Sequence, residues 1–257
     1  MFFHITEPYT CTTVDERARQ AWEQDGVVKI TGLIPLEWFV YLRNRVIEAL
    51  GTPPEHPEAW PNLKPLGRDK ECMPLAIEAV KDVVDQLIGK GWAYPNSGGG
   101  WFTNAPRQLE KQHAPKLELV PRGHWHWDAR PDLQVDGGLW LFAPVTEMLA
   151  HSGGTWLAAG SARMVTDFYA NLPPEKQGKP TRVVKKWFAD AHKWFNVLNG
   201  AEPLNQANQV DEAVRLLTVA GQPGDVILMK EFTIHSAPDY IGPGSRVCRI
   251  VTISPIP

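Results

Sequence analysis

The sequence predicts a mainly β protein with flanking helices (α+β), in which a jelly roll or β sandwich is buttressed by N-terminal helices. Two observations lead to this fold class. Helical periodicity dominates residues 1–114, whereas from residue 115 onward short β-branched runs alternate with Gly, Pro and Asp turns. The length of 257 residues suits one large domain. We therefore expect a single domain, 1–257, with a helical part at 1–114 and a jelly-roll core at 115–254.

Three helices and one strand are expected in the N-terminal part. The first helix is expected at residues 14–23, with Thr13 as its N-cap and Glu16 as the capping-box partner. Apolar residues recur at spacings of three and four in the later helices, and Gly51 and Gly89 follow them. The other expected elements are a strand at 27–31, a helix from 36 to about 50 and a helix from 73 to about 87.

The C-terminal part is expected to consist of short strands joined by turns. The expected strands lie at residues 116–120, 139–145, 155–159, 226–229 and 245–254. Residues 163–215 interrupt this pattern with Pro173-Pro174, a basic run from Lys176 to Lys186 and an expected helix around 188–198. A further short helix is expected around 209–217. We therefore treat 163–215 as a helical insert in the β core.

Composition and charge exclude several classes of protein. The formal net charge of −3 offers no field that would attract nucleic acid or an anionic membrane. The three cysteines are odd in number and widely spaced, which excludes a zinc ribbon or a disulfide framework. The first residues lack a basic segment, and no apolar run approaches the ~18–20 residues of a membrane span. We expect a cytoplasmic protein with a small-molecule substrate, whose oligomeric state the sequence does not indicate.

One short stretch, residues 123–128, concentrates potential metal ligands. It contains His124, His126 and Asp128, and in an extended strand these three side chains start on one face. A further histidine, His235, follows the turn Pro223-Gly224-Asp225 and a predicted strand. Two imidazoles and one carboxylate on one face suit ferrous iron and leave open positions for reaction. This pattern predicts that His126, Asp128 and His235 form a metal site.

Alternatives remain open around this stretch. His124 and His126 could instead form the His-x-His pair of a cupin-like metalloenzyme, an isomerase or a dioxygenase that needs no 2-oxoglutarate, although the glutamate expected there is missing. A non-catalytic ligand-binding protein is a third possibility. Trp125 and Trp127 point away from the ligand face in a regular strand, so core packing is their default role. The alternative places Trp127 at a substrate pocket, with His124 and the pair Trp101-Phe102.

An arginine follows His235 in the last predicted strand. Arg246 lies eleven residues after the histidine, and Arg249 has the opposite parity in the same strand. An arginine beside a metal site can bind a carboxylate through two parallel hydrogen bonds. Arg246 is therefore the expected clamp for a carboxylate co-substrate, and Arg249 is expected to face away.

Together these motifs resemble the phytanoyl-CoA dioxygenase-like branch of the iron(II)/2-oxoglutarate-dependent oxygenases. The resemblance covers residues 24–50 and 115–254. It is carried by residues 24–33, His126-Trp-Asp128, residues 139–145, residues 151–161, Pro223-Gly-Asp225, His235 and Arg246. Two departures are the absence of a histidine after Gly160-Ser161 and the length of the 163–215 insert.

The resemblance implies a double-stranded β-helix, the cupin-like form of the jelly roll, and an Fe(II)/2-oxoglutarate-dependent dioxygenase. It implies iron bound by His126, Asp128 and His235, with 2-oxoglutarate and O2 as co-substrates. Arg246 and Thr155 would contact the 2-oxoglutarate. The presence of Asp128 sets the chain apart from halogenating relatives and favours hydroxylation, desaturation or a related C–H oxidation. The expected substrate is a small, largely apolar metabolite of the kind found in secondary metabolism.

Overall fold

The computed structural model describes most of the chain. The described residues are 7–51, 53, 78–93, 100–104, 123–128, 138–150, 154–176, 178–201, 214–237 and 246–256. The expected strand at 116–120 and the start of the helix expected at 73 lie outside these residues. None of the described helices is long and apolar enough to cross a membrane.

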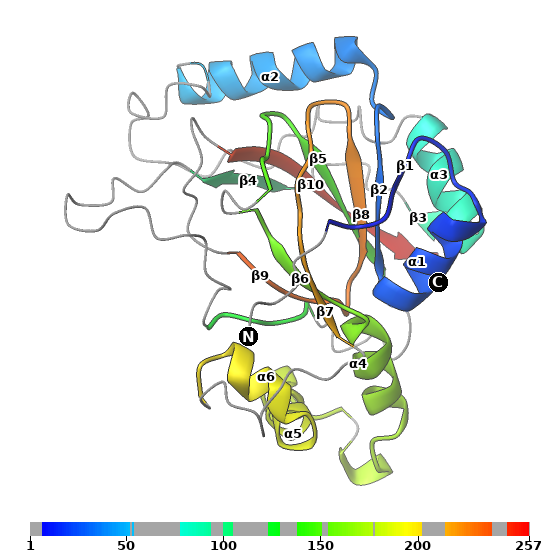
Figure 1. Ribbon diagram of the computed structural model, residues 1–257, viewed down its shortest axis with the longest axis vertical. Coiled ribbons are helices and arrows are strands. Elements are labelled where there is room, and N and C mark those ends of the chain that lie inside the picture. Colours follow the sequence, from blue (N-terminus) through cyan, green and yellow to red (C-terminus); the bar gives the residue numbers. More distant parts are fainter. Residues whose placement is uncertain are drawn as a thin grey trace, which may run out of the picture.

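Two β-sheets pack face to face (Figure 1). Among the described residues, the larger sheet has seven strands and the smaller has three. The larger follows the order β1 (Thr10–Cys11), β2 (Val27–Ile30), β8 (Val226–Lys230), β5 (Leu139–Pro144), β10 (Arg246–Pro255) and β3 (Trp92–Ala93), and β4 (Gly100–Asn104) also pairs with β10. The smaller follows the order β7 (Arg215–Thr218), β6 (Trp156–Ala159) and β9 (Ile234–Ser236).

The larger sheet is apolar on both faces because successive side chains alternate between two separate cores. On β8, Val226 and Leu228 pack outward against the N-terminal helices, whereas Ile227 and Met229 pack between the sheets. Leu157 and Leu217 of the smaller sheet meet them there. Burial on both faces explains why these strands appear in the sequence as nearly continuous apolar runs.

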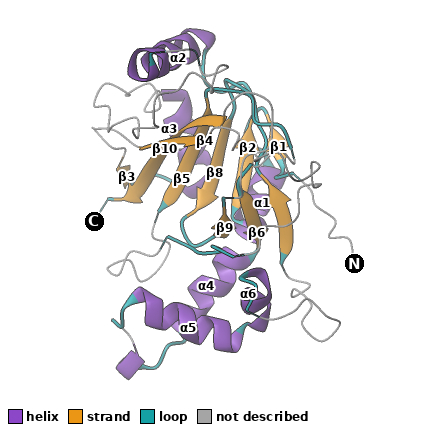
Figure 2. Ribbon diagram, turned by 90° about the vertical axis from the view of Figure 1, so that its left-hand side faces the viewer, coloured by secondary structure: helices purple, strands orange, loops and turns teal. Residues whose placement is uncertain are grey.

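Helices cover the sandwich on several sides (Figures 1 and 2). Helices α1 (Glu16–Asp25) and α3 (Glu78–Ile88) pack against the outer face of the larger sheet. Helix α2 (Leu36–Leu50) lies across one end. At the opposite end α4 (Ser161–Ala170), the short 3-10 turn Pro174–Lys176, α5 (Thr181–Ala191) and α6 (Lys193–Leu198) form a layer next to the smaller sheet. Apart from the first two residues of α4, these helices lie in the range 163–215 that the sequence predicts as a helical insert.

Two of the predicted helix boundaries are wrong. Helix α1 begins at Glu16, and its N-cap is Asp15, whose side chain accepts a hydrogen bond from the Ala18 N–H at 2.7 Å. A carboxylate at the helix N-terminus interacts with the helix dipole as well as capping the N–H, which favours Asp15 over the expected Thr13. The helix expected around 188–198 is divided in two at His192, whose extended backbone (φ −123°, ψ 80°) interrupts it.

The helix expected around 209–217 is also wrong where the structure describes it. Residues 215–218 form β7, which pairs with β6 so that Leu217 lies opposite Leu157. Consecutive leucines at 216 and 217 fit either a helix or a strand buried on both faces. The tertiary structure decides between them, because β6 supplies the backbone partners and the larger sheet covers Leu217 on the inner face. The strands expected at 27–31, 139–145, 155–159, 226–229 and 245–254, and the helix at 36–50, are confirmed to within about two residues.

Asp225 connects the turn before β8 to the end of β2. Its side chain is 2% exposed. One carboxylate oxygen accepts the Gly32 N–H at 3.2 Å, and the other accepts the Gln222 N–H at 3.0 Å. Gly224 beside it adopts a left-handed backbone with φ 100°, which favours glycine. The Pro-Gly-Asp motif is therefore a structural turn that sets where β8 begins.

Replacing Asp225 should destabilise the fold. Asp225→Ala removes the acceptor of two backbone N–H groups, and we expect the free energy of unfolding to fall by about 2 kcal/mol. Urea denaturation followed by circular dichroism measures this loss. Asp190→Ala is the control, because Asp190 is 60% exposed and pairs with Lys186 on the surface, so its loss should stay within about 0.5 kcal/mol. Equal effects of the two substitutions would contradict the structural role of Asp225.

Candidate metal centre

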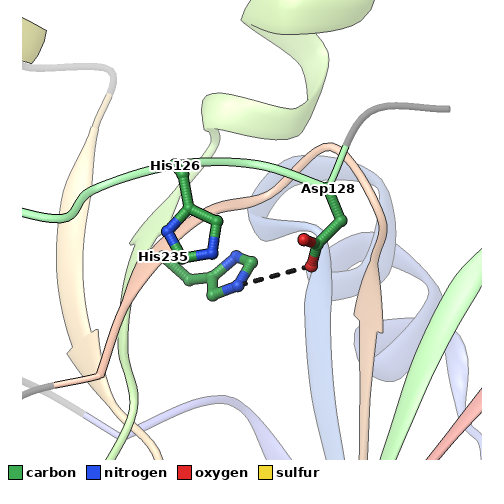
Figure 3. Close-up of side chains that lie close together, drawn as sticks. All are labelled: His126, Asp128 and His235. Atoms are coloured by element: carbon green, nitrogen blue, oxygen red, sulfur yellow. Dashed lines mark ion pairs between the residues drawn. The ribbon is translucent and has the colours of Figure 1, made fainter. Parts of the chain in front are cut away.

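The structure brings together the side chains of His126, Asp128 and His235 (Figure 3). One ligand atom from each residue lies within 4.8 Å of the others. The His235 Nε2 lies 3.5 Å from the Asp128 Oδ2, and the two imidazole rings are 4.4 Å apart between centroids. Among the described residues, no other group of three or more His, Cys, Asp or Glu side chains is arranged this way.

The two halves of this group are joined by backbone hydrogen bonds. The His126 N–H donates to the His235 carbonyl at 3.0 Å, and the His235 N–H donates to the His126 carbonyl at 2.8 Å. This single antiparallel bridge places the stretch 123–128 beside β9, at the edge of the smaller sheet. Two chain segments that are far apart in the sequence are thereby aligned residue to residue.

The stretch is not the regular strand that the sequence predicts. His124 has a left-handed backbone with φ 61°, which breaks the alternation at that point. Its side chain is exposed and does not belong to the group of ligand atoms. The predicted one-face arrangement therefore holds for His126 and Asp128 only.

The opposite edge of the stretch is attached to the helical insert. The Gly123 N–H donates to the Leu198 carbonyl at 3.0 Å, and the Trp125 N–H donates to the Asn199 Oδ1, also at 3.0 Å. Asn199 follows α6 directly, so its side chain provides an acceptor in a position where a neighbouring strand would provide a carbonyl. The stretch thus lies between β9 on one side and the insert on the other.

The two tryptophans of the stretch pack into the insert. Trp125 and Trp127 are buried in the same apolar cluster as the core of α4–α6. The Trp127 ring is 1% exposed and lies 5.2 Å from the Phe188 ring between centroids. Trp127 therefore has the packing role expected by default, and its place at a substrate pocket stays a prediction. Its anchorage keeps the side chains of its two neighbours, His126 and Asp128, on the other face.

Hydrogen bonds at the rings define which nitrogen could bind a metal. The Nδ1 of His126 lies 2.7 Å from the His124 carbonyl oxygen, and the Nδ1 of His235 lies 3.0 Å from the Thr233 carbonyl oxygen. A carbonyl can only accept, so in the neutral form of each imidazole the proton lies on Nδ1 and the lone pair on Nε2. This is how proteins usually orient metal-binding histidines. The sequence did not reveal these partners, because both are backbone atoms.

Burial keeps one of the histidines neutral. It lowers the pKa of His235 below its ordinary value, and this effect outweighs the opposing influence of the Asp128 carboxylate and of the hydrogen bond to Thr233. A neutral imidazole and a carboxylate are the protonation states that bind a cation. Two imidazole nitrogens and one carboxylate oxygen fit a divalent iron ion, and a set of only three donors leaves coordination positions for other ligands.

For most of the remaining predicted site residues, the structure describes only the backbone. Arg246 opens β10, where it pairs with Asn104, and Trp101 and Phe102 lie in β4. The side chains of these three residues lie outside the described part of the structure, so their roles stay predictions. Thr155 directly precedes β6, and its carbonyl accepts the Val219 N–H at 2.8 Å.

Two residues of the insert reach the site without having been predicted. Asn199 holds the backbone of Trp125, and Lys185 donates from its Nζ to the Trp127 carbonyl at 2.8 Å. In the sequence, Lys185 is one member of a basic run that resembles a solvated face. Both contacts join residues well separated along the chain, so no local pattern announces them.

Comparison with known proteins supports the fold. No protein-family model matches the chain, and no curated protein sequence matches it. SnoK, a non-heme alpha ketoglutarate dependent carbocyclase from nogalamycin biosynthesis, matches with a TM-score of 0.60 and 14% identity over 94% of this chain and 84% of its own. EctD from S. alaskensis matches with a TM-score of 0.55 and 15% identity over 99% and 82%.

A third structure, AviO1 from Streptomyces viridochromogenes Tue57, matches with a TM-score of 0.57 and 12% identity over 95% of this chain and 96% of its own. At identities this low, the similarity establishes the fold alone. The matched structures, together with the two facing sheets and their flanking helices, confirm the predicted jelly roll in its double-stranded β-helix form.

The buried His235 should make the metal-free protein sensitive to acid. Its pKa is lowered in the folded state, so just below the unfolded value of about 6.5 the unfolded chain binds more protons than the folded one. The free energy of unfolding should therefore decrease as the pH falls through this window. Urea denaturation at about pH 7.5 and about pH 5.5 should show a smaller decrease in His235→Gln than in the wild type. An equal decrease in the two proteins would contradict this role of His235. His124→Asn is the control, because position 124 is exposed and asparagine tolerates its left-handed backbone.

Proposed function

We propose that this chain is a non-haem iron(II)/2-oxoglutarate-dependent oxygenase of the phytanoyl-CoA dioxygenase-like branch. The observation that carries the proposal is the convergence of His126, Asp128 and His235 with both Nε2 atoms free to bind a metal. The similar structures support it. SnoK is described as alpha ketoglutarate dependent, and EctD has been solved with bound Fe and with 2-oxoglutarate and 5-hydroxyectoine.

In this proposal the chain's own residues hold and orient the reactants. His126, Asp128 and His235 are the iron ligands. The iron, once bound, supplies the activation of O2 that accompanies the decarboxylation of 2-oxoglutarate to succinate. The backbone bridge between His126 and His235 keeps the ligands in position before metal arrives, which lowers the entropic cost of binding. Trp125 and Trp127 pack behind the stretch and exclude water from that side.

Arg246 is the proposed partner of the far carboxylate of 2-oxoglutarate. Along β10 it has the parity of Cys248, which is buried between the two sheets, and Arg249 has the opposite parity. Thr155, at the start of the strand next to β9, is proposed as a second contact. The geometry favours this function over the cupin-like alternative, because that alternative requires His124 as a ligand and His124 lies outside the group.

The proposed reaction is the oxidation of a C–H bond, by hydroxylation, desaturation or a related step. The proposed substrate is a small, largely apolar metabolite of secondary metabolism. We further propose that the protein acts in the cytoplasm, without nucleic acid or membrane as a partner.

Iron and 2-oxoglutarate binding can be tested directly. Anaerobic addition of both to the metal-free protein should produce a weak visible charge-transfer band. His126→Ala should abolish the band, because only two protein ligands remain. His124→Asn is the matched control, since asparagine tolerates the left-handed backbone and position 124 is outside the ligand group, so the band should persist. The proposed function is wrong if the wild type shows neither the band nor O2-dependent formation of succinate.

The role of Arg246 has its own test. Arg246→Ala should weaken 2-oxoglutarate binding about 10- to 100-fold, as expected for the loss of a charged hydrogen-bonded pair. Anaerobic titration of the charge-transfer band measures this affinity independently of turnover. Arg249→Ala, at the opposite parity of the same strand, should have no effect of this size. Unchanged affinity in Arg246→Ala would contradict the assignment and would favour an enzyme that does not use 2-oxoglutarate.

A further inference from the structure

One cation of the helical insert lies against the candidate metal centre. Lys185 is a half-buried residue of α5, and its Nζ donates to the Trp127 carbonyl at 2.8 Å. The same Nζ lies 5.0 Å from the centroid of the Trp127 ring. Burial lowers the pKa of this ammonium, and the negative charge of Asp128 acts in the opposite direction. Lys185 thus contacts the residue that directly precedes Asp128.

Neighbouring cations of the basic run do not share this position. Lys186 is 73% exposed and forms an ion pair with Asp190 at 3.1 Å on the surface. Lys176 lies over the ring of Trp187, a residue of the same insert. Burial of a charge is unfavourable unless it is compensated, and here it lowers the pKa of the Lys185 ammonium. The carbonyl, the ring and the carboxylate provide the compensation.

The contact with the Trp127 carbonyl acts on Asp128 through the peptide bond. The carbonyl of Trp127 and the N–H of Asp128 belong to the same planar unit, so a bond that fixes the oxygen also fixes the plane from which Asp128 projects. The last bridge bond of the stretch is at His126, two residues earlier. Among the described residues, Lys185 is the only side chain that donates to the Trp127 carbonyl.

We propose that Lys185 is a positioning residue for Asp128. By holding the Trp127–Asp128 peptide plane, it keeps Asp128 directed at the two imidazoles, so that the ligand group is formed before a metal binds. This inference rests on the proposed function, since it concerns a ligand of the metal site. It gives the helical insert a direct part in that site.

Metal affinity distinguishes positioning from a purely electrostatic effect, because the two predict opposite signs. Removal of a positive charge near a divalent cation should by itself tighten metal binding. Loss of a residue that orients a ligand should weaken it, typically about 10- to 100-fold. We expect Lys185→Met to bind Co²⁺ at least about 10-fold more weakly than the wild type, with altered visible absorption bands that report the changed coordination.

Two further variants make the test specific. Lys185→Arg retains the charge and the donor and should restore both affinity and spectrum. Lys186→Met removes the neighbouring exposed cation and should behave as the wild type. Hydrogen exchange of the metal-free proteins gives a readout without metal, in which the amides of residues 123–128 should exchange faster in Lys185→Met than in Lys186→Met. If Lys185→Met does not fold, Lys185→Gln takes its place in the same measurements.

Unchanged or tighter Co²⁺ binding in a folded Lys185→Met would overturn the inference. So would a variant whose only change is a raised KM for an organic substrate, which would make Lys185 a substrate contact. Failure of the wild type to bind Co²⁺ or Fe²⁺ and 2-oxoglutarate would instead disprove the proposed function.

Discussion

The candidate site depends on one antiparallel bridge between His126 and His235. Its two backbone hydrogen bonds, 3.0 and 2.8 Å long, are the direct backbone link between the stretch 123–128 and β9. An antiparallel bridge places two residues opposite each other with their side chains on the same face. The imidazoles therefore lie side by side without any contact between the side chains having to bring them together, and Asp128 follows two residues later on the same face.

The helical insert provides the second support of the stretch. The carbonyl of Leu198 and the Oδ1 of Asn199 accept hydrogen bonds from the stretch, and Lys185 donates one to it. An apolar cluster of the insert also buries Trp125 and Trp127. A strand at the edge of a sheet normally leaves one row of backbone groups without partners. In this protein a helix end and two polar side chains take the place of the missing strand. The alternating sequence His-Trp-Asp then has a simple physical meaning, since the tryptophan anchors the segment and the flanking residues face the site.

The protonation states of the site follow from burial and from backbone acceptors. The carbonyls of His124 and Thr233 hold the Nδ1 protons, and burial disfavours a charged His235. The left-handed backbone at His124 fits this arrangement, since the carbonyl of that residue turns back to the ring of His126. A strained conformation at a non-glycine residue next to a candidate ligand is a common feature of functional sites. His124 contributes through its backbone, whereas the sequence directed attention to its side chain.

Local patterns in the sequence determined the class of fold, most of the strands and helices, and the identity of the three candidate ligands. Alternation, helical spacing and turn residues act over a few positions, so they are legible without the structure. The N-cap at Asp15 and the identity of β7 were missed because a carboxylate interaction and a neighbouring strand outweighed the local signals. Only the tertiary structure decided that the His124 side chain lies outside the group of ligand atoms and that Trp127 packs in an apolar cluster. It alone also decided that Lys185 and Asn199 reach the site. Each of these depends on hydrogen bonds or packing between segments far apart along the chain, and such contacts leave no trace in local periodicity.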